Sequence, residues 1–236
     1  MLPVMRAGRS AEETVRRELL YMSLYFAVYL ATLFLTREGE WAHWLSLVVI
    51  PLTALWWFRR RKGLKLDLPS VGLHKGRAKS GIVLALFAGV AFSLLQLAGR
   101  QGEAIRAYFL SGQALYLLPL SFFLMLATAA STEEFFFRGV LQTRLTRVLR
   151  SPVFGILAAS LLFGLFHLPY AYLNPAWPSA GVWAEAWRAA LATGVPLGVV
   201  LGTVFVLSGE SLLAPVLLHA LINLLPGMLV VARLLS

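Results

Sequence analysis

Long apolar runs are the feature of this sequence that most restricts its fold. Seven runs approach the ~20 residues that a helix needs to cross the hydrocarbon core of a bilayer. They cover residues 18–36, 41–58, 80–99, 113–134, 152–169, 186–207 and 211–232. Within a bilayer the backbone must pair its own N–H and C=O groups, so helices are the expected spanning element. The sequence therefore predicts an all-α, polytopic membrane helix bundle of about seven (six to eight) transmembrane helices.

Composition supports a membrane location and excludes several kinds of site. Hydrophobic residues make up 59% of the 236 residues, and charged residues only 14%. A soluble domain carries about a quarter charged residues. Cysteine is absent, which excludes a disulfide framework, a thiolate metal site and a cysteine nucleophile. Because no internal repeat or low-complexity linker is evident, we expect one integral membrane domain over residues 1–236.

The net charge of +10 is best explained by the membrane. Basic residues flank the apolar runs instead of alternating with aromatic residues, so we expect membrane lipids as partners and no nucleic acid. Arg6, Arg9, Arg16 and Arg17 precede the first run, and only Arg37 follows it. This asymmetry predicts a multi-pass protein of the cell membrane with a cytoplasmic N-terminus. The first run is too long for a cleavable signal peptide, and we expect it to remain as a span.

Polar residues interrupt the apolar runs at three places, where each ionisable side chain costs about 2.5 to 3.5 kcal/mol on insertion scales. In the first cluster, Glu134 and Arg138 are four residues apart, which places them on one helix face as an expected ion pair. Glu133 points away from that face. Two interpretations remain open: the three residues form a structural ion network, or Glu133 is a carboxyl suited to proton transfer.

The second and third clusters each place a histidine on a helix face. His167 follows Phe163 by four residues, and Asn223 follows His219 by four residues. Pro215 comes one turn before His219, and we expect it to kink the last span because it lacks a backbone N–H.

A helical hairpin would bring the first two clusters to one level. Glu133 lies 17 residues before Arg150 and His167 lies 17 residues after it, with a turn at Ser151-Pro152. If the fourth helix continues to Leu149, an antiparallel hairpin places Glu133 and His167 side by side. The tip of this hairpin is predicted to be cytoplasmic, because it carries Arg144, Arg147 and Arg150.

At these positions the sequence resembles the CAAX-protease and bacteriocin-processing family, also called Abi proteins, which includes the type II CAAX prenyl endopeptidases. All three signatures of that family occur in order. Glu-Glu-x-x-x-Arg matches Glu133, Glu134 and Arg138; Phe-x-x-x-His matches Phe163 and His167; and His-x-x-x-Asn matches His219 and Asn223. The signature-bearing catalytic core would span about residues 113–232, and the first 110 residues match only as generic membrane helices.

The resemblance implies a glutamate-dependent intramembrane endopeptidase. In such an enzyme Glu133 and His167 would activate a water molecule, and His219 and Asn223 would stabilise the oxyanion. Glu134, Arg138 and Phe163 would have supporting roles. The implied substrate is a CAAX-type prenylated tail or another hydrophobic peptide, and no cofactor is expected.

Three alternatives stay open. Glu133, His167 and His219 could hold a catalytic zinc in a three-ligand site, although no His-Glu-x-x-His run is present. The chain could be a transporter whose intramembrane Glu, His and Arg line a pathway, although the inverted repeats typical of that class are not evident. It could also be a non-catalytic scaffold or immunity protein of the same fold. The sequence predicts no oligomeric state.

Overall fold

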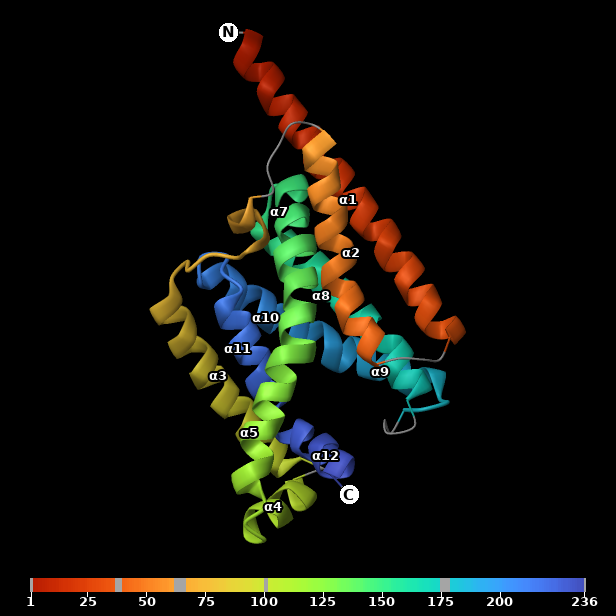
Figure 1. The fold of residues 1–236 in the computed structure, drawn as a ribbon, viewed down its shortest axis with the longest axis vertical. Helices are drawn as coiled ribbons and strands as arrows, with labels where there is room; N and C mark the ends of the chain where they lie inside the picture. The colour runs from red at the N-terminus through yellow and green to blue at the C-terminus, as the bar shows by residue number, and fades with distance from the viewer. Residues whose placement is uncertain (1, 37–39, 62–66, 100–101, 175–178, 236) are drawn as a thin grey trace. The chain divides into compact units, whose positions relative to one another are not determined.

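The structure is a computed structural model that describes residues 2–36, 40–61, 67–99, 102–174 and 179–235 (Figure 1). Within these ranges the side chains of residues 2–11, 35–36, 40–46, 58 and 61 are not described. Helices make up all of the regular structure in the described ranges, which contain no strand. The prediction of an all-α fold is confirmed.

The helical elements follow one another with short connections. In chain order they are α1 (Leu2–Thr36), α2 (Glu40–Arg61), η1 (Leu68–Val71), α3 (Ala78–Ala98), α4 (Gly102–Leu110), α5 (Ala114–Met125), η2 (Leu126–Ala130), α6 (Ser131–Glu134), η3 (Phe135–Gln142), α7 (Thr143–Leu149), α8 (Pro152–Leu173), α9 (Trp183–Ala189), η4 (Ala190–Gly194), α10 (Val195–Leu207), α11 (Leu213–Ile222) and α12 (Leu224–Leu235). η1 is a 3₁₀ turn, whereas η2, η3 and η4 are π-helical stretches that continue the neighbouring α-helices.

Several of these helices are long and apolar enough to cross a membrane. Among the described residues, four continuous helices qualify: Ala78–Ala98, Ala114–Leu149, Pro152–Leu173 and Trp183–Leu207. Counting the bent pair α11 and α12 as one span gives five. The chain is therefore a multi-pass membrane helix bundle. The expected spans 18–36 and 41–58 lie within α1 and α2, but part of each lies outside the described side chains, so the number seven stays a prediction.

Packing divides the chain into two compact units, each of which is described by itself. The first unit comprises residues 1–73 and 135–203, and the second comprises residues 74–134 and 204–236. One of the three boundaries along the chain falls directly after Glu134. The expectation of a single domain over the whole chain stays a prediction.

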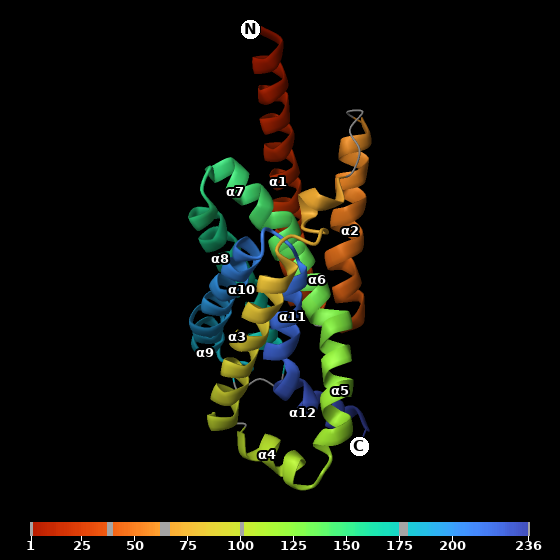
Figure 2. The same ribbon diagram turned by 90° about the vertical axis from the view of Figure 1, so that its left-hand side faces the viewer.

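In the first unit, α7 and α8 form the hairpin that the sequence predicted (Figure 2). Arg150 adopts the left-handed conformation with φ of 53°, and the Ser151 hydroxyl caps α8 by accepting from the Phe154 N–H. A Cβ on Gly155 would lie 2.1 Å from the Thr146 hydroxyl oxygen, so the two helices approach very closely. The helix that enters this hairpin runs without interruption to Leu149, as expected.

A buried ion network corrects the expectation for Arg144. Its side chain is only 2% exposed, and its Nε donates to Glu18 of α1 at 3.1 Å. Arg59 of α2 donates to the same carboxylate at 2.9 Å. Arg144 therefore joins three helices of the first unit and is not a surface charge of the hairpin tip. Arg150, one and a half turns later, is exposed and pairs with Glu12.

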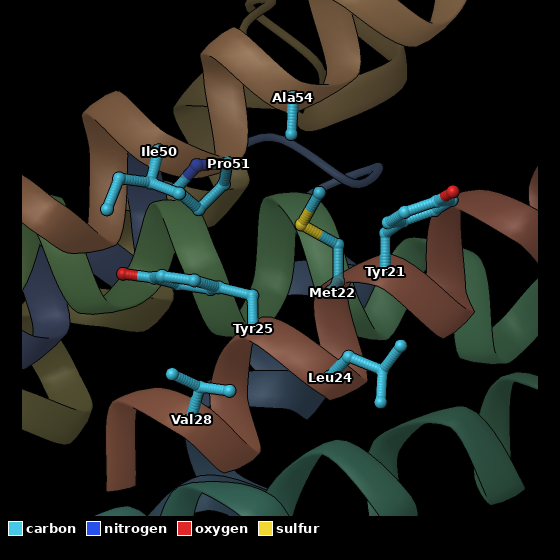
Figure 3. A pocket seen from close by; sticks show the side chains of 8 residues that line it. All are labelled: Tyr21, Met22, Leu24, Tyr25, Val28, Ile50, Pro51 and Ala54. Carbon is cyan, nitrogen blue, oxygen red and sulfur yellow. The ribbon is translucent and has the colours of Figure 1, made fainter. Parts of the chain in front are cut away.

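An apolar groove lies between α1 and α2 of the first unit (Figure 3). Its volume is about 340 Å³. The groove is lined by Tyr21, Met22, Leu24, Tyr25, Val28, Ile50, Pro51 and Ala54. None of the signature residues is part of this lining, so the groove is distinct from the candidate site described below.

In the second unit, small residues bring α3 close to α11 (Figure 2). Gly81, Ala85 and Gly89 recur every four residues along α3 and are buried. A Cβ on Gly89 would lie 2.8 Å from the Cβ of Leu221, a distance that real side chains do not reach. These glycines therefore serve helix packing within the unit.

Candidate active site

The helix that carries the glutamate pair is widened on both sides of it. The π-helical stretches η2 and η3 flank α6, which holds Glu133 and Glu134. π-Helical turns are rare and are frequently found at functional sites. The sequence prediction assumed regular α-helical geometry here, and that assumption is wrong for residues 126–130 and 135–142.

Hydroxyl side chains support the widened segment. Thr128 donates to the Leu124 carbonyl at 2.6 Å, and Thr132 donates to the Thr128 carbonyl at 2.8 Å. Ser131 reaches back five residues, to the carbonyl of Leu126. Hydroxyls that bond to backbone carbonyls in this way commonly bend helices. Ser131-Thr132 directly precedes the glutamates in the first polar cluster, but their bonds to backbone carbonyls were not predicted from the sequence.

The two glutamates of the first signature meet the histidine of the third in the second unit. Glu133, Glu134 and His219 are 6%, 0% and 2% exposed. The His219 Nδ1 lies 2.7 Å from a carboxylate oxygen of Glu134, across 85 residues of sequence. The other ring nitrogen, Nε2, lies 4.0 Å from a carboxylate oxygen of Glu133. The structure thus brings the first and third clusters together, with His219 between two carboxylates.

This contact gives Glu134 a partner that the sequence analysis did not foresee. When Glu134 is ionised, its carboxylate only accepts hydrogen bonds, and Nδ1–H of His219 is the donor. The tautomer and orientation of the ring are then set by Glu134, which leaves Nε2 on the side of Glu133. A contact across 85 residues has no local sequence signal, and only the packing of α6 against α11 creates it.

Asn223 occupies a break between two helices. α11 ends at Ile222, α12 begins at Leu224, and the two are bent by 60°. The expectation of a kink at Pro215 is wrong, because Pro215 lies in the first turn of α11, where its missing N–H costs no helical bond. Pro226, in the first turn of α12, cannot donate to the Ile222 carbonyl one turn earlier, and the helix breaks there.

Two side chains outside the signatures hold the backbone around this break. The Gln96 amide donates to the Ile222 carbonyl at 2.8 Å, and the Ser121 hydroxyl donates to the Leu224 carbonyl at 2.7 Å. Neither residue was singled out from the sequence. Each is a polar residue within an apolar run, which is visible in the sequence. No local feature of the sequence indicates which carbonyl it binds.

The remaining signature residues form a stack in the first unit. The Arg138 guanidinium lies 4.4 Å from the centre of the Phe163 ring, and the His167 ring lies 4.6 Å from the same ring. Nδ1 of His167 is 2.8 Å from the Phe163 carbonyl oxygen. Because a carbonyl only accepts, Nδ1 donates, and a neutral ring then carries its lone pair on Nε2. Phe163 therefore orients both polar residues.

Backbone carbonyls of two glycines in α10 accept hydrogen bonds from polar side chains of η3. Arg138 donates to the Gly198 carbonyl at 3.2 Å, and one turn later Gln142 donates to the Gly202 carbonyl at 3.0 Å. A Cβ on Gly198 would lie 2.9 Å from the Cβ of Ser160 in α8, so a larger residue would force the helices apart. The spacing of Gly194, Gly198 and Gly202 by four residues was a signal for this packing that the sequence analysis did not use.

The seven signature residues are divided between the two units. Glu133, Glu134, His219 and Asn223 belong to the second unit, whereas Arg138, Phe163 and His167 belong to the first. The expected ion pair of Glu134 with Arg138, and the expected approach of Glu133 to His167, would each join the two units, and both stay predictions.

No group of three His, Cys, Asp or Glu side chains among the described residues is arranged to hold a metal ion. The alternative of a catalytic zinc on Glu133, His167 and His219 would need ligands from both units, and it stays a prediction.

Comparison with known proteins agrees with the signatures. No curated protein and no solved structure matched the chain. The model of one family, described as type II CAAX prenyl endopeptidase Rce1-like, matches residues 115–225. This range contains all seven signature residues and falls within the predicted core of residues 113–232. Residues 115–225 are therefore similar to the Rce1-like type II CAAX prenyl endopeptidases, in agreement with the resemblance that the three signatures indicated.

Proposed function

We propose that this protein is a glutamate-dependent intramembrane endopeptidase whose substrate is a CAAX-type prenylated tail or another hydrophobic peptide. The observation that carries the proposal is the buried contact of His219 with Glu134 and Glu133. Placing two carboxyl groups and an imidazole inside apolar helices is costly, and such groups mark functional sites by default. The match to the protease family over the same residues supports the same conclusion.

In the proposed reaction, the Glu133 carboxylate takes a proton from a water molecule as the water oxygen adds to the carbonyl carbon of the scissile bond. His167 holds this water with its Nε2 lone pair. The proton then passes from Glu133 to the leaving nitrogen as the C–N bond breaks, and the carboxylate is regenerated. General acid–base catalysis of this kind contributes about 100- to 10,000-fold in rate. The joint action of Glu133 and His167 is taken from the family resemblance.

His219 and Asn223 are proposed to donate hydrogen bonds to the oxyanion that forms on the carbonyl oxygen, with His219 doubly protonated so that Nε2–H can donate while Nδ1–H stays with Glu134. In a well-studied protease, losing one such donor costs about 2.7 to 4 kcal/mol in the transition state. Glu134 would keep His219 in the orientation needed for this role, which its 2.7 Å contact supports. Arg138 and Phe163 would act on His167, which the ring stack supports.

The proposed setting is the cell membrane, with the N-terminus on the cytoplasmic side and membrane lipids around the helices. The reaction as written needs no cofactor. Apolar surroundings of the signature residues suit a hydrophobic or lipidated peptide, since three further phenylalanine rings pack in a cluster with Phe163 of the stack: Phe136, Phe137 and Phe166.

The test is peptide cleavage by the purified protein in detergent, with prenylated and unprenylated C-terminal tails as substrates. We expect wild-type cleavage that Glu133→Gln lowers by at least about 100-fold and that a metal chelator does not change. Glu103→Gln, the same change at an exposed position of the second unit, is the matched control and should keep full activity. Full activity of Glu133→Gln would refute the proposal, and an absence of wild-type cleavage would favour a scaffold or a transporter.

A further inference from the structure

The break at Asn223 leaves the Ile222 carbonyl without its usual helical donor. In a continuous helix the Ile222 carbonyl would accept from residue 226, but that residue is Pro226 and has no N–H. The helical bonds on either side are intact: the Asn223 N–H donates to the His219 carbonyl at 3.0 Å, and the Gly227 N–H donates to the Asn223 carbonyl at 2.8 Å. The Ile222 carbonyl therefore lacks a helical donor for a covalent reason, the proline ring.

Gln96 replaces this missing donor from another helix. Its amide nitrogen lies 2.8 Å from the Ile222 oxygen, across 126 residues of sequence. An unpaired carbonyl is especially costly in a membrane, where no water can satisfy it. The Ser121 hydroxyl donates to the Leu224 carbonyl at 2.7 Å. Side chains of α3 and α5 thus hold the two carbonyls that flank Asn223 in the sequence.

Gln96 reaches this carbonyl because α3 packs tightly on α11. Gly89, one heptad before Gln96, would place a Cβ 2.8 Å from the Cβ of Leu221, the residue before Ile222. A spacing of seven residues keeps Gln96 on the same face of α3 as Gly89. Close packing at Gly89 therefore brings the Gln96 amide within hydrogen-bonding distance of the break.

We propose that Gln96 is a positioning residue for Asn223, acting through the Ile222 carbonyl, with Ser121 assisting at Leu224. The inference rests on the proposed function, in which Asn223 stabilises the oxyanion. Asn223 ends the same helical turn that carries His219, so the place where that turn stops decides where its side chain points. Without the Gln96 bond the break is free to shift along the chain, and Asn223 loses its fixed orientation.

The predicted kinetic effect is a loss in kcat rather than in substrate binding. Gln96 contacts the backbone and not the reacting atoms, and a misplacement of about 1 Å in a catalytic group can cost about 100-fold in rate. We expect Gln96→Leu to lower kcat by about 10- to 100-fold, with KM within about twofold of wild type. Gln113→Leu, the same change at an exposed position of the second unit, should leave both constants unchanged.

Pro226→Ala supplies the rescue test, because alanine restores the backbone N–H that Ile222 lacks. If Gln96 acts through that carbonyl, Gln96→Leu should cost less than about threefold in kcat when Pro226→Ala is present. Equal losses from Gln96→Leu in both backgrounds would overturn the proposal, and so would wild-type kcat in the single variant. Should Gln96→Leu fail to fold, Gln96→Met, which keeps the length of the side chain, is read in the same way.

Different results would refute the proposed function and the role of Gln96. If the wild type cleaves, Glu133→Gln is inactive and Gln96→Leu retains wild-type kcat, the protease function stands and the role of Gln96 is refuted. If Glu133→Gln is as active as wild type, the proposed function itself is refuted, and the role of Gln96 is refuted with it.

Discussion

The two signature histidines are held in different ways. His219, in the second unit, is 2% exposed and donates to a carboxylate 85 residues away in sequence. His167, in the first unit, is half-buried and donates to a carbonyl four residues earlier in its own helix. A charge fixes the first ring, whereas local helix geometry and an aromatic stack fix the second. We therefore expect His219 to depend on one distant residue and His167 to depend on packing.

The largest expected effect tests the charged partner. Glu134→Gln keeps the size of the side chain but removes the negative charge beside Nδ1 of His219. We expect kcat to fall by about 100-fold, since charge-assisted hydrogen bonds are roughly twice as strong as neutral ones and the ring orientation depends on this one. Cleavage kinetics of the purified variant measure the loss. A variant with more than a third of wild-type kcat would show that His219 does not depend on this carboxylate.

A smaller effect is expected when the aromatic partner of His167 is changed. Phe163→Leu keeps an apolar side chain and the backbone carbonyl that accepts from His167, but it removes the ring between Arg138 and His167. We expect a loss of about 10-fold in kcat, because the local hydrogen bond remains and the lost cation–π contact is worth about 0.5 to 2 kcal/mol. If Phe163→Leu proves more harmful to kcat than Glu134→Gln, the comparison of the two histidines is wrong.

Overpacking beside the His167 stack should mainly lower the thermal stability of the protein. Gly198→Ala places a methyl group 2.9 Å from the Ser160 Cβ, beside the carbonyl that Arg138 binds. Overpacking of this kind costs about 1 to 3 kcal/mol. We expect a lower midpoint of thermal unfolding in detergent, measured by circular dichroism. The control is Ala192→Ser, at an exposed position. Gly181→Ala is not a suitable control, because φ at Gly181 is +75° and a side chain there would strain the backbone. An unchanged midpoint would show that α8 and α10 can separate without cost.

The smallest effect is expected at an exposed ion pair, which provides a baseline for the buried contact of His219 with Glu134. Glu12 precedes the candidate spans, and its hydrogen bond with Arg150, followed by that with Arg16, lowers the pKa of its carboxyl below the ordinary value. A lowered pKa in the folded state means that the pair stabilises the protein at neutral pH and loses this contribution as the pH falls through that pKa.

Thermal unfolding of wild type and Glu12→Gln should therefore differ slightly at pH 7 and become equal at acidic pH. High salt should remove the difference as well, because exposed charges are screened. A difference that grows on acidification would contradict this assignment.

The sequence was sufficient for the helices and for the identity of the signature residues. Apolar runs near the length of a span, the turn at Ser151-Pro152 and the four-residue spacings within each signature all depend on local rules. The match of the family over residues 115–225 confirms the resemblance drawn from those residues. The last span contains two prolines that could bend it, and the prediction chose the wrong one. The span bends at Asn223, ahead of Pro226, and not at Pro215.

What the sequence by itself determined was which residues are costly in a membrane and which helices carry them, because both follow from hydropathy and from the period of a helix. Tertiary structure alone decided their partners. Glu134 reaches His219, Gln96 reaches Ile222, and Arg144 reaches Glu18 across 85, 126 and 126 residues. Such pairings depend on how closely two helices approach, which glycines such as Gly89 permit and no single helix specifies.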